Sequence, residues 1–191
     1  MSRCSWPRWT ISCDGRSPVR WVAFLRAINT GNRRVTGDRL AAVFESLGFG
    51  EVTSFQASGN VLFTATDAPD RSTIEQALED DLGYAVPTPL RNRSDGERIV
   101  ADEPFTAAQL AVTEGRIQVM FLRDPMPSGL LEAGLPDTPA DDLLELRPSE
   151  VFWLPREGIS GSLLSPPAIE KLVGPLTVRT LNTVARIHAR L

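Results

Sequence analysis

Two strand-like segments joined by a short turn make up EVTSFQASGNVLFTA, residues 51–65. Residues 51–56 and 60–65 are rich in β-branched and aromatic side chains, as strands usually are. Ala57, Ser58 and Gly59 lie between them and have the composition of a turn. The stretch therefore predicts an antiparallel hairpin.

A helix is predicted on each side of this hairpin. Upstream, Thr36 or Asp38 can cap a helix that Gly48 ends, and downstream a second helix runs over about residues 72–82. Both helices carry apolar side chains at three- and four-residue spacing, namely Leu40, Val43, Phe44 and Leu47 in the first and Ile74, Ala77, Leu78 and Leu82 in the second. This spacing gives each helix one apolar face for packing on a sheet.

A further strand is predicted beyond each helix. Residues 19–28 are rich in apolar and aromatic side chains at both odd and even positions, as in a central strand covered on both faces. Residues 86–90 are predicted to form a short strand after Gly83. The resulting order is strand, helix, strand, strand, helix, strand. This is the order of a ferredoxin-like plait.

The polar run at residues 91–96 predicts a boundary between two units. We expect a poorly ordered extension over residues 1–18, a first ferredoxin-like unit over 19–92 and a second α/β unit with a C-terminal helix over 93–191. The second unit is expected to contain a helix at 96–102, strands at 117–122, 143–146 and 151–154, and helices at 168–173 and 181–191. Four prolines within residues 124–140 predict a long surface loop. The fold class is therefore α+β.

Composition favours a soluble cytoplasmic protein. The 24 acidic and 20 basic side chains give a net charge of −4, which offers no global positive field and disfavours nucleic-acid binding. Apolar runs are only a few residues long, far short of the roughly 20 that cross a bilayer. With cysteines only at positions 4 and 13 and a single histidine, His188, we expect neither a disulfide framework nor a metal site of nitrogen and sulfur ligands, and no cofactor. The oligomeric state is left open.

Three short stretches together carry a resemblance to a known family: FLRAIN at 24–29, QASGNV at 56–61 and TVRTLNT at 177–183. In this order and spacing the chain resembles the bacterial domain-of-unknown-function family 1697 over residues 19–191. The resemblance implies two small ferredoxin-like units packed together, and it implies no established reaction. The chain departs from the family pattern at Ala27, where glycine is usual, and at Thr180 and Leu181, where asparagine and tryptophan are usual. Thr180 can still cap a helix.

Two arginines are candidate anion ligands. Arg26 shares the parity of Phe24 and Ile28 in the predicted first strand, so its guanidinium either forms a structural ion pair or lines an anion site. Arg179 precedes the predicted last helix, whose free N–H groups and positive dipole end also favour an anion. The alternative for Arg179 is a helix start with a solvated basic face.

Four further polar side chains join the candidate ligand site. Asn182 follows Arg179 at i+3, and Asn29 lies in a glycine-containing loop after the first strand. Ser58 and Asn60 flank Gly59 and could present a hydroxyl and an amide to a ligand, although such a triplet is more often simply a turn.

The leading functional hypothesis is a small anionic ligand, such as a nucleotide or a phosphorylated metabolite, bound between the two halves. One alternative is an enzyme of unknown class that uses the same cleft, with the arginines as electrophilic groups and Ser58 or a carboxylate in the reactive role. No coupled nucleophile and base can be named, so the catalytic residues are unknown. The other alternative is a protein or RNA interaction module, for which Phe63 is the sole aromatic residue on its predicted strand.

Overall fold

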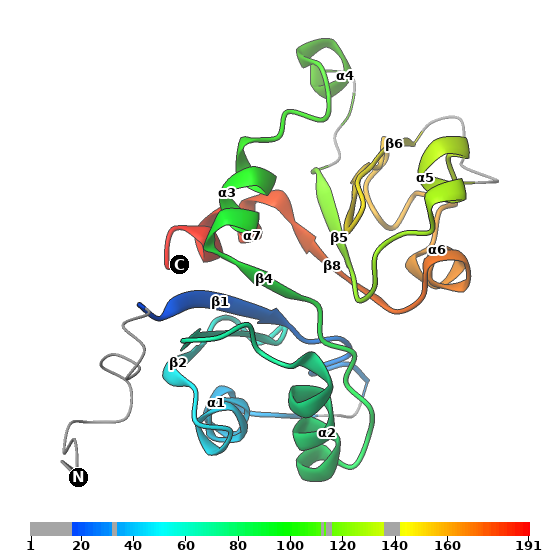
Figure 1. The fold of residues 1–191 in the computed structure, drawn as a ribbon. Coiled ribbons are helices and arrows are strands. Elements are labelled where there is room, and N and C mark those ends of the chain that lie inside the picture. Colours follow the sequence, from blue (N-terminus) through cyan, green and yellow to red (C-terminus); the bar gives the residue numbers. More distant parts are fainter. Residues whose placement is uncertain (1–16, 32–33, 112, 114–115, 136–141) are drawn as a thin grey trace, which may run out of the picture. The chain divides into compact units, whose positions relative to one another are not determined.

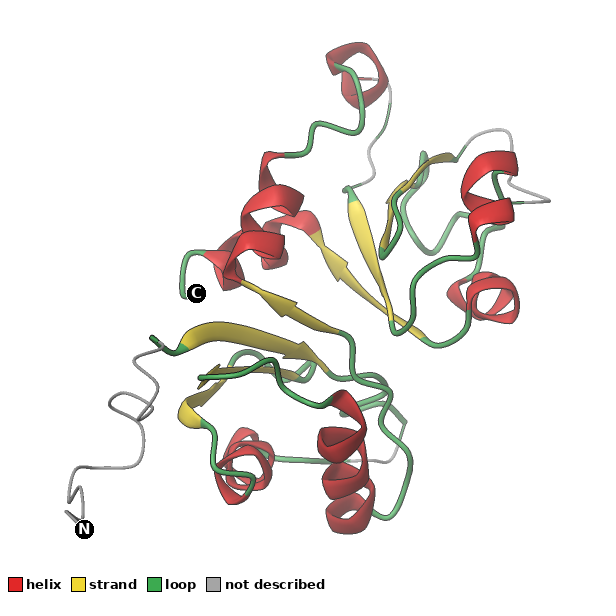
Figure 2. Cartoon of the chain, viewed as in Figure 1, coloured by secondary structure: helices red, strands yellow, loops and turns green. Residues whose placement is uncertain are grey.

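The computed structural model describes residues 17–31, 34–111, 113, 116–135 and 142–191. The chain divides into two compact units, the first ending at Arg93 and the second beginning at Ser94. Figure 2 shows that both contain helices and strands. The predicted N-terminal extension falls almost entirely on residues 1–16, which lie outside the described residues.

The first unit is the predicted ferredoxin-like plait (Figure 1). Its elements are β1 (Val19–Phe24), α1 (Gly37–Ser46), β2 (Gly50–Ser54), β3 (Asn60–Ala65), α2 (Arg71–Leu82) and β4 (Leu90–Asn92). The four strands form one antiparallel sheet in the order β2-β3-β1-β4. β1 is central in the sheet, in agreement with its dense apolar sequence.

The core of this unit lies between the sheet and its two helices. Side chains from β1 and β3 pack against the apolar faces of α1 and α2. The ring centroid of Phe44 in α1 lies 5.2 Å from that of Phe63 in β3, and the centroid of Phe63 lies 4.5 Å from that of Phe49, with the rings tilted in both pairs. Helix starts are capped as their sequences require, because Thr36 accepts a hydrogen bond from the Arg39 N–H and Asp70 accepts from the N–H groups of two residues in the first turn of α2.

The predicted strand at 86–90 is displaced to Leu90–Asn92. The earlier residues still lie along β1, because the N–H groups of Phe24 and Arg26 donate to the carbonyls of Pro89 and Pro87 at 2.9 and 3.1 Å. Those prolines have no N–H to return a bond, so regular pairing begins only after them.

The second unit repeats the plait. Its sheet elements are β5 (Gln118–Leu122), α5 (Ser128–Ala133), β6 (Leu143–Leu146), β7 (Glu150–Leu154), α6 (Pro166–Val173) and β8 (Leu176–Thr180). The antiparallel order β6-β7-β5-β8 matches that of the first sheet. Two helices, α3 (Arg93–Ala101) and α4 (Ala107–Ala111), precede these elements, and α7 (Leu181–His188) follows them. Figure 1 shows α5 and α6 on one side of this sheet and α3 and α7 on the other.

Three elements of the second unit escaped prediction: α4, α5 and β8. α5 begins directly after Pro127, within the proline-rich stretch assigned to a loop, because proline is tolerated at a helix start. β8 contains the family-like run TVRT, which was assigned only to the approach of the last helix. The two form the second unit's counterparts of α1 and β4, so the plait is complete.

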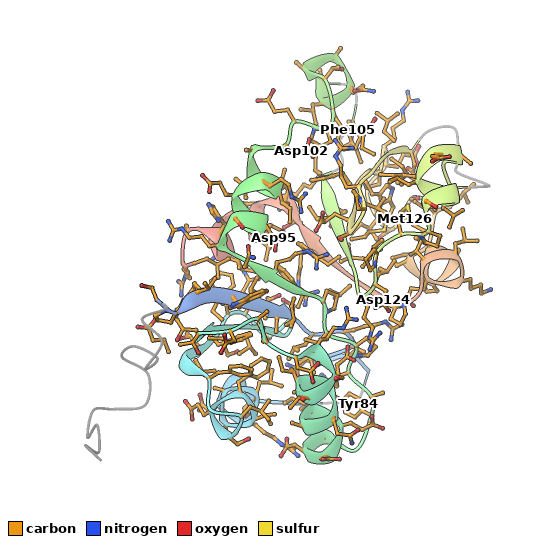
Figure 3. The ribbon with its side chains drawn as sticks, in the orientation of Figure 1. Tyr84, Asp95, Asp102, Phe105, Asp124 and Met126 are labelled. Carbon is orange, nitrogen blue, oxygen red and sulfur yellow. The ribbon has the colours of Figure 1, made fainter. Side chains whose placement is uncertain are left out.

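Polar side-chain contacts fix the loops and helices of the second unit. The Trp153 indole N–H donates to the Asp142 carboxylate at 3.0 Å, and the Ser162 hydroxyl donates to the same carboxylate oxygen. Asp102, at the end of α3 (Figure 3), accepts two hydrogen bonds from Arg147, at 2.9 and 3.1 Å. These bonds raise the pKa of Arg147.

Two features are absent from the described residues. Among them, no helix has both the length and the hydropathy to cross a membrane. The same residues contain no group of three or more His, Cys, Asp or Glu side chains placed to hold a metal ion.

Candidate functional site

The first predicted cluster lies where β1 leaves the sheet of the first unit. Asn29 fastens the loop that follows this strand, since its side-chain amide donates to the carbonyls of Val35 and Ala57 at 3.0 and 2.8 Å. The Asn29 side-chain oxygen accepts the Val35 N–H at 2.7 Å. The loop after β1 and the β2–β3 turn are thus joined through one side chain.

Asn60 and Ser58 hold the β2–β3 turn itself. The Asn60 amide, fully buried, donates to the Phe55 carbonyl at 2.8 Å and to the Ser58 hydroxyl oxygen at 3.1 Å. Ser58 is exposed. The structure therefore brings Asn29, Ser58 and Asn60 together, and it gives both amides backbone carbonyls as partners. These contacts match the turn alternative, while ligand binding by the three stays a prediction.

The same two loops hold three non-glycine residues in the left-handed region. Ala27, Asn29 and Gln56 have φ values of 57°, 56° and 61°. Such a conformation costs an alanine about 1–2 kcal/mol. The value at Ala27 gives a physical reason for the glycine that is usual there in the family the chain resembles.

Arg26 does not lie on a strand. β1 ends at Phe24, and Arg26 is half-buried in the turn that follows. The parity argument that placed its guanidinium on the apolar face of a strand is therefore wrong. Its N–H donates to Pro87, so the backbone at this position is fixed.

Arg179 lies on β8 and is 9% exposed. One guanidinium nitrogen donates to the Thr177 hydroxyl and to the Val178 carbonyl, both at 2.8 Å. Burial lowers the pKa of Arg179 to about 10. Arg26 belongs to the first unit and Arg179 to the second, and their common pocket stays a prediction.

A cavity of about 580 Å³ lies beside the start of α7, entirely within the second unit. Its walls come from the end of α3, the approach to β5, and the junction of β8 with α7. The lining residues are Val100, Arg116, Ile117, Thr180, Leu181, Asn182 and Ala185. Asn182, one of the predicted site residues, thus lines this cavity.

Backbone contacts hold the floor of this cavity in place. Gln118 pairs with Thr180 across β5 and β8, and the Leu181 N–H donates to the Ile117 carbonyl at 2.9 Å. The Gln118 amide donates to the Arg116 carbonyl at 2.7 Å. Thr180 caps α7 by accepting the Thr183 N–H, as the sequence predicted.

Ion pairs hold the wall formed by α3. Arg98 of α3 donates to the buried Glu150 carboxylate at 3.0 Å, and Asp102 pairs with Arg147. Both acceptor–donor pairs join α3 to the β6–β7 hairpin of the same unit. Val100 lies between Arg98 and Asp102 in the chain, so its position in the cavity wall is fixed from both sides.

Two polar side chains that line the cavity have no partner among the described residues. Within the described part of the chain, neither the Arg116 guanidinium nor the Asn182 side-chain amide forms a hydrogen bond or an ion pair. Sequence reasoning missed Arg116, because an exposed arginine before a strand carries no signal of its own. Its place in the cavity follows only from the fold, which brings the β5 approach next to the start of α7.

The two plaits, each with a four-stranded antiparallel sheet, define a two-unit α+β protein of the ferredoxin-like type. The chain belongs to the family described as "Protein of unknown function (DUF1697)", whose model matches residues 19–152.

A solved structure supports the fold. The conserved bacterial protein SP0830 from Streptococcus pneumoniae is similar to this chain with a TM-score of 0.65 and 20% sequence identity. The similarity covers 92% of this chain and 99% of that chain. A search of curated proteins gives no match.

Proposed function

We propose that this protein binds a small anionic ligand in the cavity beside the start of α7. One observation carries the proposal: the Arg116 guanidinium and the Asn182 amide line the same cavity, and neither is used by another described residue. A volume of 580 Å³ lies within the range of small-molecule sites, roughly 300–1,000 Å³.

The polar groups supply a modest binding energy. A charge-assisted bond from Arg116 gives about 1.5–3 kcal/mol, and the Asn182 amide adds about 0.5–1.5 kcal/mol. The positive end of α7 contributes roughly 0.3–1 kcal/mol more. Together these contacts support affinity in about the millimolar range, so tighter binding requires contact with the cavity walls.

Nucleotides and phosphorylated metabolites are the ligands that the sequence favours. Among the other predicted ligand residues, Arg26, Asn29, Ser58 and Asn60 belong to the first unit, and Arg179 lies on β8 just before the cavity residue Thr180. The participation of Ser58, which is exposed, is tested separately with a Ser58→Ala variant. The proposal itself depends on Arg116 and Asn182.

The test is calorimetric titration of the full chain with inorganic phosphate, AMP and acetate. We expect at least one anion to bind, and Arg116→Ala to weaken it about 10- to 150-fold, the equivalent of one charge-assisted bond. Arg186→Ala is the matched control, since Arg186 is an exposed arginine of α7 that does not line the cavity. Binding that Arg186→Ala weakens as much as Arg116→Ala would mean a general charge effect, and the proposal would be wrong.

A further inference from the structure

Four of the seven lining residues of the α7 cavity are apolar. They are Val100 from α3, Ile117 before β5, and Leu181 and Ala185 from α7. Leu181 and Ala185 lie one helical turn apart, so they present a continuous apolar strip along the start of the helix. An ion without an apolar part would leave this strip facing water.

Among the described residues that line the cavity, only Arg116 has a charged side chain. A guanidinium pairs with one carboxylate or one phosphate group through two parallel hydrogen bonds. A polyphosphate would bring several negative charges to this one cation, on a chain whose net charge is already −4. The charge balance therefore favours a ligand with one anionic group.

The polar groups and the apolar strip of the cavity lie at adjacent positions in the chain. Arg116 and Ile117 are consecutive, as are Leu181 and Asn182, so a polar group borders the apolar strip at both of these places. A ligand that places its anionic group at Arg116 and Asn182 brings the rest of its body against Ile117 and Leu181.

We infer that the ligand of this cavity is an organic monoanion with an apolar body, such as an aliphatic or aromatic carboxylic acid, rather than free phosphate or a polyphosphate. This inference rests on the proposed function, because it specifies the ligand of the same site. It also narrows that proposal, since nucleotides and phosphorylated metabolites carry more than one negative charge at pH 7 and are then excluded.

Three matched probes test the inference by calorimetric titration: phenylacetate, acetate and phenylacetamide. Acetate retains the carboxylate and lacks the ring, while phenylacetamide retains the ring and lacks the charge. We expect phenylacetate to bind at least about tenfold more tightly than either, since burial of the ring and pairing of the charge should each strengthen binding by more than that factor. Inorganic phosphate and ATP should not displace it.

Variants separate the two parts of the site. Arg116→Ala should reduce phenylacetate affinity to that of phenylacetamide. Leu181→Ala should weaken phenylacetate about threefold or more and leave acetate unchanged, because only the ring contacts the apolar strip. Circular dichroism spectra of both variants must match that of the parent, and Arg186→Ala should bind all three probes as the parent does.

The outcomes distinguish this inference from the proposed function. If phosphate or ATP binds more tightly than phenylacetate and Arg116→Ala abolishes that binding, the anion site stands and the inference is overturned. If no anion binds, or if Arg116→Ala changes nothing, both the site and its ligand class are wrong.

Discussion

Replacing Gly59 by alanine tests whether the QASGNV turn is built by close packing. Gly59 has φ of 78°, and a Cβ at this position would lie 2.7 Å from Ile28 Cβ and 3.2 Å from Leu25 Cβ. The added methyl group therefore meets the side chains of the segment that follows β1. Two costs follow: about 1–2 kcal/mol for an alanine in the left-handed region and about 1–3 kcal/mol for overpacking.

Gly83 provides a matched control for the backbone cost. Its φ is also 78°, and a Cβ there would meet nothing within 4 Å. We expect Gly83→Ala to lower the free energy of unfolding by about 1–2 kcal/mol and Gly59→Ala by about 2–5 kcal/mol. Urea unfolding followed by circular dichroism measures both. Equal losses in the two variants would show that Gly59 is needed only for its φ, and the packing argument would be refuted.

Three further predictions concern single side chains. Ala27→Gly should stabilise the protein by about 0.5–1 kcal/mol in urea unfolding, because relief of the left-handed alanine exceeds the entropy cost of glycine; a loss of stability would contradict the assigned φ. Asp142→Ala should cost about 2–4 kcal/mol, since it leaves the buried Trp153 N–H without an acceptor and removes the bond from Ser162, whereas Ser162→Ala should cost only about 1 kcal/mol. Hydrogen bonds from the first turn of α2 lower the pKa of Asp70 from 3.8 to about 2, so its charged form stabilises the fold above the unfolded pKa and this contribution disappears as the pH falls through 2. Asp70→Asn should therefore flatten the fall in unfolding temperature over this pH window. If the profile of the variant matches that of the parent, Asp70 does not cause the fall.

Much of the fold was accessible from the sequence, because the first unit has consistent local signals. The predicted bounds of β6 in the second unit agree with the structure, as do those of β3 in the first unit, where the hairpin between β2 and β3 is confirmed. In that unit, apolar spacing, caps and turn residues all favour the same elements.

The remaining elements lacked a local signal. β8 is short and carries the buried Arg179, so its sequence does not read as an apolar strand, and its pairing with β5 is a contact between distant parts of the chain. α5 begins among prolines, which favour a loop reading as readily as a helix start.

The candidate site was only partly accessible. Asn29, Ser58 and Asn60 were predicted as ligand residues from their polar types, and this stays a prediction. The structure shows that both amides donate to backbone carbonyls. Arg116 has no distinguishing neighbour in the sequence. Only the pairing of β5 with β8 places it on the same cavity as Asn182.

Mapping of backbone amide chemical shifts on the full-length protein tests the central claim most directly. The tightest of the four anions, acetate, phenylacetate, phosphate and AMP, is titrated into isotope-labelled protein. The account predicts that the largest shifts fall on Val100, Ile117, Leu181 and Asn182, and that Arg116→Ala removes them. Saturable shifts confined to the loops around Asn29 and Ser58, with the start of α7 unchanged, would contradict the claim that this cavity is the binding site.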